Sequence, residues 1–408
     1  MHSFAYTQGS FDDFYKKLDR AKYGIADRDA FRDRVNILRG RINSLDFPYH
    51  FKIFKSKSRT LCTPADYETT ILVRKVNSDF NRVAKIANIS RSETIKSIKC
   101  MCSEEVPYTV VRLDIRRFYD SINIDHLISV VSHATRHTYA LRRNIEAFLR
   151  WSRVNIGGVP TGLSLSASLA EFYLRQEFDE KVRQIPGVNF YTRYVDDIIL
   201  VCLPGKSGAD YIAAAESLLP LGLKFNDDPI KKTFVELRSA EAKGTFEYLG
   251  YSFLVGGFEN TAEYKGRKVL IDIAKSKIDR RKTRFVKSLL QFLKDGSEND
   301  LKRRHLLINS GYTYRDAATD CVISAGICNT YSEIDFPSNA LLELNEFYKF
   351  CLVGKKFPLR PRLKMSHLSS SAVRTMLSLD PNKHVQLKKY ISFTASELTN
   401  LTRCWRDA

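Results

Sequence analysis

Two adjacent carboxylates interrupt a stretch of the chain that otherwise has the composition of a β-sheet. Residues 190–200 read F-Y-T-R-Y-V-D-D-I-I-L, and Asp196 and Asp197 fall between two strand-like runs, 188–194 and 198–203. The sequence therefore predicts a tight hairpin with both acids at its tip. Upstream, the β-rich run Y-T-V-V-R-L-D-I carries a third carboxylate, Asp114, near its end. Neighbouring strands would bring the three carboxylates together.

A cluster of this kind has a specific chemistry. Two like charges about 4 Å apart repel by roughly 4 kcal/mol at an effective dielectric of about 20, so cations are needed to keep the carboxylates ionised. Hard oxygen ligands favour Mg²⁺, and two such ions would activate an attacking hydroxyl and neutralise a leaving pyrophosphate in phosphoryl transfer. We therefore expect Asp114, Asp196 and Asp197 to be catalytic residues that hold two Mg²⁺ ions. Each signal alone is more typical of a surface turn or a helix cap.

The charge of the chain points to a polyanionic partner. Of its 408 residues, 65 are lysine or arginine and 46 are acidic, which gives a formal net charge of +19. Nucleic acid is the first candidate, and an anionic membrane surface is the rival. The sequence has no apolar run of membrane-spanning length and no signal-peptide pattern at its start, so we expect a cytoplasmic protein without a membrane partner. The eight cysteines lack metal-ligand spacing, which favours reduced, mostly buried thiols.

The patterning along the chain divides it into three zones. Residues 11–45 have helical periodicity, with Asp27 placed as a helix cap, and residues 51–64 alternate apolar and basic residues as an exposed hairpin would. Strand and helix patterns alternate over 108–254. After Tyr264 the pattern is mainly helical, and Ser276 with Asp279 resembles a capping box at the start of a helix.

Five motifs in this order resemble those of the reverse transcriptase family. They are L-D-I-R-R-F-Y-D-S-I, then G-G-V-P-T-G-L-S-L-S-A-S-L-A-E-F-Y-L, then Y-T-R-Y-V-D-D-I-I-L, then G-L-K-F-N-D-D-P-I-K-K-T, and finally F-E-Y-L-G-Y. The resemblance assigns direct metal binding to Asp114 and Asp196, and a less direct part to Asp197. It also identifies Tyr119 as the aromatic steric gate that excludes a ribose 2′-hydroxyl, with a core tyrosine as the alternative.

The same resemblance implies residues that bind the incoming deoxynucleotide. The basic hairpin would hold the triphosphate, with Arg59 the strongest candidate, and a solvated basic hairpin is the alternative. The turn 157–162 would lie beneath the template base and the sugar, although Thr161 stands where the family often has glutamine. Of two adjacent lysines, Lys232 is favoured as the one near the pyrophosphate, with a plain surface lysine as the alternative. The predicted deoxynucleotide-binding residues are Lys55, Lys57, Arg59, Tyr119, Thr161, Gly162 and Lys232.

Two further segments are expected to contact nucleic acid. Tyr248, Leu249 and Gly250 match the primer grip of the family. Residues 275–287 carry seven basic side chains against one acid. In a helix their apolar residues would face the core, while Lys277, Arg281 and Arg284 would face a duplex backbone. A solvated helix without such contacts is the alternative.

The resemblance implies an α+β fold of the right-hand polymerase type. We expect N-terminal helices and fingers over 1–103, a ferredoxin-like palm over 104–254 with fingers-side helices at about 123–155, and a helical thumb with a C-terminal extension over 255–408. The implied activity is that of an RNA-directed DNA polymerase, a nucleotidyltransferase that extends a DNA product with deoxynucleotides (dNTPs).

Softer matches indicate a subgroup. The serine-rich G-L-S-L-S-A-S-L-A-E, with H-L-L-I-N-S-G-Y-T-Y-R-D and S-A-G-I-C-N, resembles bacterial defence-associated reverse transcriptases of the abortive-infection-like group, and the type 3 group within them. That subgroup implies antiphage defence, a non-coding RNA as template, and a second reverse transcriptase or a further copy of the chain as partner. The alternatives are a retron-type reverse transcriptase and an RNA-binding scaffold whose polymerase site is vestigial.

Overall fold

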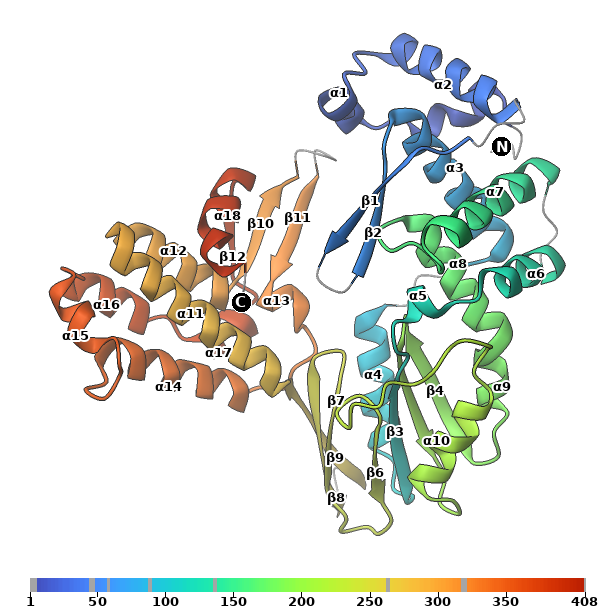
Figure 1. Ribbon diagram of the computed structural model, residues 1–408. Helices are drawn as coiled ribbons and strands as arrows, with labels where there is room; N and C mark the ends of the chain where they lie inside the picture. Colours follow the sequence, from blue (N-terminus) through green and yellow to red (C-terminus); the bar gives the residue numbers. More distant parts are fainter. Residues whose placement is uncertain are drawn as a thin grey trace. The chain divides into compact units, whose positions relative to one another are not determined.

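The computed structural model describes residues 6–43, 48–56, 59–86, 90–134, 138–261, 265–316 and 321–406. The chain folds into two compact units. The first consists of Met1–Ser90 and Pro107–Arg238, and the second of Arg91–Val106 and Ser239–Ala408. The three expected domain boundaries remain a prediction. Figure 1 shows the elements of both units, which are described separately below.

The first unit begins with short helices and an antiparallel hairpin. The helical elements are η1 (Gln8–Phe14), α1 (Lys17–Tyr23) and α2 (Arg28–Asn43). Asp27 caps α2, because its Oδ1 accepts a hydrogen bond of 2.9 Å from the amide of Ala30. Strand β1 (Phe51–Ser56) pairs with β2 (Arg59–Pro64), which confirms the predicted hairpin.

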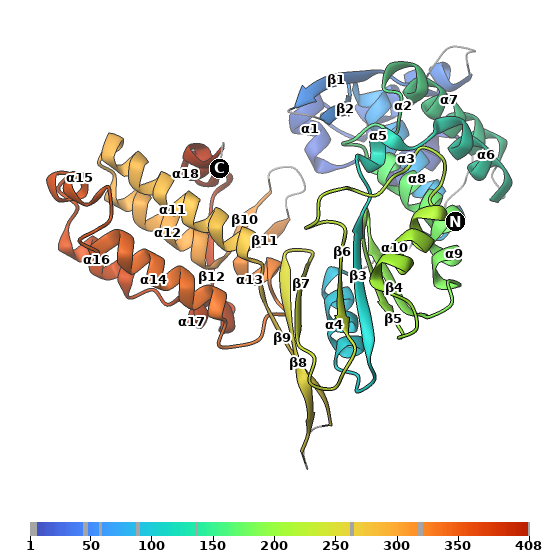
Figure 2. The ribbon, with the colours of Figure 1, turned by 60° about the horizontal axis from the view of Figure 1, so that its bottom comes forward.

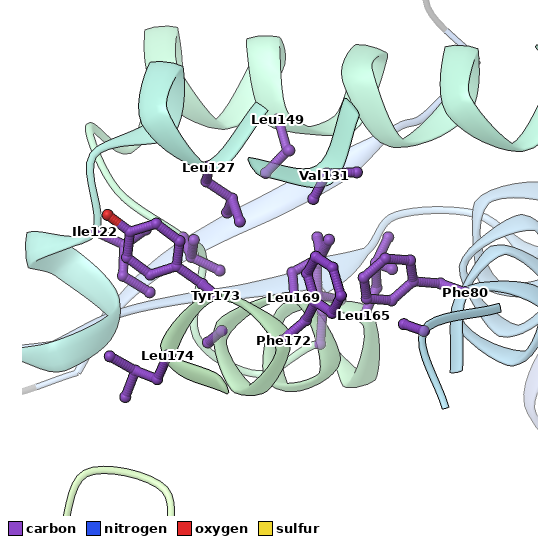
Figure 3. Close-up of a cluster of buried hydrophobic side chains, with 14 of the residues drawn as sticks. Phe80, Ile122, Leu127, Val131, Leu149, Leu165, Leu169, Phe172, Tyr173 and Leu174 are labelled. Atoms are coloured by element: carbon purple, nitrogen blue, oxygen red, sulfur yellow. The ribbon is translucent and has the colours of Figure 1, made fainter. Parts of the chain in front are cut away.

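A helical cluster follows and contains much of the core of this unit. Its elements are α3 (Tyr67–Ala84), α5 (Phe118–Ser121), α6 (Ile124–Ala134), α7 (Tyr139–Asn155) and α8 (Ser164–Leu174). Apolar residues at helical spacing turn inward from these elements, which is the pattern expected of helices that pack on one another. Figure 3 shows Leu127 and Val131 of α6 and Leu149 of α7 facing Leu169 of α8, while Phe80 of α3 packs beside Leu165. This cluster fixes the direction of α8, which continues through η2 (Arg175–Asp179) into α9 (Glu180–Arg183).

A four-stranded sheet completes the first unit. It contains β3 (Tyr108–Asp114), β4 (Val188–Tyr194), β5 (Asp197–Cys202) and β6 (Thr233–Leu237), in the spatial order β4-β5-β3-β6 with every pairing antiparallel. The two central strands are almost continuously buried, which explains their unbroken apolar character. Helix α10 (Gly208–Ser217) packs against β3 and β6 and lies along the sheet in Figure 2.

The second unit begins with α4 (Arg91–Cys102) and a three-stranded meander of β7 (Gly244–Tyr248), β8 (Tyr251–Asn260) and β9 (Lys265–Ile273). Helix α11 (Lys275–Asp295) follows and buries Ile278, Phe285, Leu289 and Phe292 along one stripe. The predicted capping box of Ser276 and Asp279 is wrong, because α11 begins earlier and its N-cap position is Ala274.

Helices α12 (Glu298–Asn309) and α14 (Asn339–Val353) pack on α11. The short elements α13 (Ile327–Thr330), α15 (Arg360–Met365), α16 (Ser370–Leu377), α17 (Pro381–Gln386), α18 (Ala395–Thr402) and η3 (Arg403–Trp405) complete the helical part. A small sheet has the order β11-β10-β12, formed by β10 (Gly311–Arg315), β11 (Val322–Gly326) and β12 (Tyr390–Phe393). The expectation of a mainly helical stretch after Tyr264 therefore misses four strands, β9 to β12.

The mixture of helices and largely antiparallel sheets confirms the α+β class. Within the described ranges, no helix combines the length and the apolar character needed to cross a bilayer.

Candidate active site

The sheet of the first unit brings the three predicted carboxylates together at one end. Asp114, the last residue of β3, lies directly opposite Asp197, the first residue of β5. Side chains of directly opposed residues lie on the same face of a sheet, with their Cβ atoms about 4.5–5.5 Å apart. The amide of Ile115 donates a hydrogen bond of 3.1 Å to the carbonyl of Asp196, which ties the end of β3 to the hairpin tip. Three acids from two separate motifs thus occupy one end of β3 and β5.

Two cations, one from β3 and one from the segment before β6, already contact these acids. Lys231 Nζ lies 3.0 Å from Asp114 Oδ1, which also accepts a 3.0 Å hydrogen bond from Asn226 Nδ2. On the other side, Arg112 Nη2 lies 3.6 Å from Asp197 Oδ1. The carboxylates are therefore partly neutralised by side chains of the protein itself.

Lys231, and not the predicted Lys232, belongs to this cluster. Lys232 Nζ forms an ion pair of 2.8 Å with Glu216 Oε2 on α10. Both lysines lie in the turn that follows Asp228, whose carbonyl accepts hydrogen bonds from the two amides, and their side chains reach different acids. Lys232 therefore lies away from the carboxylates, although its predicted function requires a position near them.

Burial and mutual repulsion oppose the ionisation of the hairpin carboxyls. Burial raises the pKa of Asp196, and the charges of Asp114 and Asp197 raise it further, while Lys231 lowers it. Burial also raises the pKa of Asp197, against the lowering effect of Arg112. Groups whose charged form is disfavoured in this way gain most from a cation of high charge density.

The hairpin tip contains an unusual backbone conformation. The turn between β4 and β5 consists of two residues, and Val195 has a φ of 60°. A positive φ at the first of two turn residues is typical of a type II′ turn, where glycine is usual. A β-branched residue in this region is strained, at a cost on the order of 1–3 kcal/mol, so the surroundings must hold it.

The buried side chain of Arg193 stabilises this turn through hydrogen bonds. Its Nη1 donates 2.8 Å hydrogen bonds to the carbonyl of Val195 and to Glu171 Oε2, and its Nη2 donates to Asp179 Oδ2 at 2.7 Å. The side chain is 2% exposed. Burial disfavours the charged form of Arg193, but the hydrogen bond and charge of Asp179 outweigh it and raise the pKa. A permanently charged, buried guanidinium therefore joins the turn to helix α8 and to η2.

The predicted steric gate lies beside the carboxylates. Burial raises the pKa of Tyr119, and the charge of Asp196 raises it further, so the hydroxyl stays protonated. The glycine-rich turn packs directly on this residue. The amide of Val159 donates a 2.8 Å hydrogen bond to the Tyr119 carbonyl, and a Cβ on Gly158 would lie 2.7 Å from the same oxygen. Only glycine permits this approach at position 158.

The far side of that turn meets the N-terminal hairpin. The amide of Cys62 on β2 donates a 2.8 Å hydrogen bond to the carbonyl of Thr161. Gly162 has a φ of 106°, and a Cβ there would lie 2.9 Å from the Cys62 carbonyl. The turn therefore connects β2 to the start of α8, so Thr161 acts through its backbone in this contact.

The predicted triphosphate-binding residues are only partly described. Lys55 is exposed on β1, in register with Thr60 of β2. Arg59 is the first residue of β2, and its side chain is outside the described part of the chain. Lys57 lies outside the described residues. The role of these three residues remains a prediction.

The predicted primer grip is a tight turn of the second unit. Tyr248 ends β7, while Leu249 and Gly250 have φ values of 48° and 79° and form the connection to β8. Two positive φ values in succession are typical of a type I′ turn. Arg91 of α4 donates to the carbonyl of Leu249, and its guanidinium lies 5.0 Å from the ring centroid of Tyr251. Sequence reasoning gave no role to Arg91, which braces this turn.

The basic residues of α11 do not all face outward. Lys277 is exposed, but Arg281 donates to the carbonyl of Ile308, and its guanidinium lies 5.9 Å from the ring centroid of Tyr331. Burial lowers the pKa of Arg281. The guanidinium of Arg284 lies 5.5 Å from the Trp405 ring centroid. The expectation that Arg281 and Arg284 project toward a duplex is therefore wrong in its geometry, because both turn toward partners within the unit.

The oxygen atoms of this cluster are suitable ligands for divalent cations, although the three side chains are not arranged as in a metal site. Asp114, Asp196 and Asp197 supply only hard oxygen atoms, and the ammonium of Lys231 lies against Asp114. In the described ranges, no three His, Cys, Asp or Glu side chains converge in the arrangement of a metal site. A divalent ion at Asp114 would compete with Lys231 for the same carboxylate oxygen.

Sequence reasoning missed the supporting residues of this site. Asn226 and Lys231 lie within the fourth motif, but the choice between adjacent lysines needed the backbone direction. Arg193 stands two residues before the turn, so its alternation with inward-facing Tyr191 was a usable signal that it is buried. Its partner Asp179 lies 14 residues earlier, at the end of a π-helical turn that has no sequence signature.

Comparison with known proteins identifies the domain. Residues 60–253 match the family model described as "Reverse transcriptase (RNA-dependent DNA polymerase)". The matched segment includes the three carboxylates, Tyr119 and the glycine-rich turn. The match supports a reverse transcriptase domain in this segment and indicates that the protein is an RNA-directed DNA polymerase, a nucleotidyltransferase. The family implies an RNA template, a DNA product and dNTP substrates. A search of curated proteins gave no match.

Proposed function

We propose that the Asp114, Asp196 and Asp197 cluster is the polymerase centre and works by two-metal phosphoryl transfer in bacterial antiphage defence. The observation that carries the proposal is the direct opposition of Asp114 and Asp197 across β3 and β5, with Asp196 in the adjoining turn. Reverse transcriptase domains use divalent metal ions such as Mg²⁺. When bound, these ions would lower the pKa of the primer hydroxyl and neutralise charge on the leaving pyrophosphate.

The side chains of the domain would position the substrates. Asp114 and Asp196 would ligate the ions directly, and Asp197, held by Arg112, would contribute mainly its charge. The ring of Tyr119 would occupy the space of a ribose 2′-hydroxyl and so select deoxynucleotides. Lys231 would be released from Asp114 as the ions bind, and its ammonium would then be free to protonate the pyrophosphate.

In the proposed right-hand arrangement, the β1-β2 hairpin belongs to the fingers, the β4-β5-β3-β6 sheet forms the palm, and α11 begins a helical thumb. The enzyme would act in the cytoplasm on a non-coding RNA template, alone, as a homo-oligomer or with a second reverse transcriptase. The net charge of +19 supports a nucleic-acid partner.

Phage infection of cells that carry an Asp196→Ala/Asp197→Ala variant tests the proposal. We expect loss of both protection and DNA synthesis. Protection that survives the loss of synthesis would instead support an RNA-binding scaffold. Retention of both would overturn the assignment of the polymerase centre.

Sequencing the RNA bound to the purified protein, together with any attached DNA, identifies the template, the primer and the product. A DNA covalently joined to a structured RNA would favour the retron-type alternative.

A further inference from the structure

A layer of short helices covers one side of the helical part of the second unit. It comprises α15, α16 and α17 with their connections, residues 355–389, and is called the basic layer below. Helix α14 packs against all three helices, and α12 packs against α16 and α17. The apolar side chains of the layer turn toward these longer helices, and Leu363, Ala372, Met376 and Val385 are buried.

The outer side of the basic layer is strongly positive. The segment contains nine lysine or arginine residues against one acid, Asp380. That acid is used locally, because its Oδ1 accepts a 2.9 Å hydrogen bond from the amide of Asn382 at the start of α17. Eight of the basic side chains are exposed: Lys355, Lys356, Arg362, Lys364, Arg374, Lys383, Lys388 and Lys389.

These eight cations differ from other cations of the same unit. Lys282 pairs with Glu343 at 2.5 Å, Arg303 pairs with Glu397 at 2.9 Å, and Lys349 pairs with Glu346 at 2.6 Å. None of the eight forms an ion pair with any carboxylate in the part of the chain that the structure describes. Like charges concentrated without counter-ions repel one another, and a polyanion that neutralises them is bound favourably.

The chemistry of the layer distinguishes between two polyanionic surfaces. A helix that lies on a membrane needs an exposed apolar face beneath its charges. The basic layer has its apolar face covered by α12 and α14, and Met365 and Leu387 are its exposed large aliphatic residues. Serine hydroxyls accompany the charges, with Ser370, Ser371 and Ser378 exposed. Cations mixed with short hydroxyls are typical of contacts to a sugar-phosphate backbone.

We propose that the basic layer binds the sugar-phosphate backbone of a structured RNA. This RNA site belongs to the unit that does not contain the carboxylates, so it is distinct from the predicted polymerase centre. The identification of RNA as the polyanion rests on the proposed function. The layer would hold the RNA by its shape and phosphates without reading its sequence, which suits a template or scaffold that stays bound through repeated synthesis.

Binding of an RNA hairpin to the full-length protein tests this inference. The test variant replaces four cations of the layer, as Lys355→Gln/Lys356→Gln/Arg362→Gln/Lys364→Gln. The control replaces four exposed cations elsewhere, as Arg28→Gln/Lys206→Gln/Lys243→Gln/Lys294→Gln, and so removes the same net charge. Fluorescence anisotropy would measure the affinity for the RNA from about 50 to 200 mM salt.

We expect the affinity of the layer variant to fall at least tenfold more than that of the control. Its slope of log affinity against log salt should be less steep by up to about 3.6, since each phosphate contact with a duplex contributes roughly 0.9. Equal losses in the two variants, or a slope unchanged from wild type, would overturn the inference. Circular dichroism confirms that both variants fold.

Two further measurements separate this inference from the proposed function. Primer extension on a short homopolymer RNA with a DNA primer should be within about twofold of wild type in the layer variant. Loss of RNA affinity by the layer variant, together with full primer extension by Asp196→Asn, would leave the RNA surface standing while the proposed polymerase centre fails. Binding to vesicles with anionic lipid, lost in the layer variant while RNA affinity is retained, would replace RNA by a membrane surface and refute the proposal.

Discussion

Replacing Arg193 by methionine tests whether a buried charge network holds the catalytic turn. Methionine keeps most of the apolar volume but removes the guanidinium that joins Glu171, Asp179 and the Val195 carbonyl. Arg193→Met leaves Asp179, whose side chain is 7% exposed, without its cation. The turn also loses the donor that accompanies the positive φ of Val195.

The expected loss can be estimated from these contacts. Removal of one partner from a buried ion pair typically costs 3–5 kcal/mol, because an uncompensated charge remains. The side chain of Glu171 is 24% exposed and can gain water, so the lower end applies. We expect Arg193→Met to lower the free energy of unfolding by about 3 kcal/mol. The double variant Arg193→Met/Asp179→Asn should lose less, because the orphaned charge is also removed.

Urea denaturation followed by circular dichroism measures these losses. Because displacement of a reacting group by about 1 Å can cost on the order of a hundredfold in rate, we also expect at least a tenfold fall in kcat under conditions where the variant is folded. Arg193→Lys should recover part of the stability and less of the rate, since lysine cannot bridge all three partners. The reasoning would be refuted if Arg193→Met lost less than about 1 kcal/mol of stability. It would also be refuted if the double variant had a lower free energy of unfolding than the single variant.

Three further results are expected from the same site. Lys231→Ala should slow dNTP incorporation by about 10²-fold or more, as loss of a general acid does, whereas Lys232→Ala should change it little; the reverse order would restore the original choice of lysine. Val195→Gly should leave the free energy of unfolding unchanged or raise it by up to about 1 kcal/mol, because relief of the strained positive φ opposes the larger conformational entropy that glycine loses on folding. A clear decrease in the free energy of unfolding would show that Val195 is not strained. Burial raises the pKa of Asp197, so the stability that its protonated form gives the folded protein is complete below the ordinary value of about 3.9 and is lost as pH rises through the raised pKa. Without divalent metal, the free energy of unfolding of wild type should therefore increase relative to Asp197→Asn as pH falls through that interval; denaturation curves with the opposite trend would contradict the burial of this carboxyl.

The polymerase site was predictable where local pattern alone places a residue. The strand patterns around Asp196 and Asp197 predicted the hairpin, although Asp197 starts β5 instead of lying in the turn. Alternation predicted the basic hairpin of β1 and β2, and periodicity predicted the buried stripe of α11. These features depend on residues within one element, so they are visible in the sequence.

Other features depend on contacts between distant segments. The inward turn of Arg281 follows from the position of Ile308, which comes from α12. The choice of Lys231 follows from the pairing of residues 224–226 with the end of β3. The hydrogen bond from Arg193 to Asp179 depends on a π-helical turn that places Asp179 within reach. A helical period predicted for α11 says which residues are apolar, but not which arginine has a carbonyl within reach.

Primer extension with an RNA template tests the central claim, that the Asp114, Asp196 and Asp197 cluster synthesises DNA. The full-length protein is given a DNA primer on an RNA template, dNTPs and Mg²⁺, and the length of the product is followed over time. Wild type should extend the primer, and Asp196→Asn, which keeps the shape of the side chain and removes its charge, should not. Extension by Asp196→Asn at the wild-type rate would contradict the account.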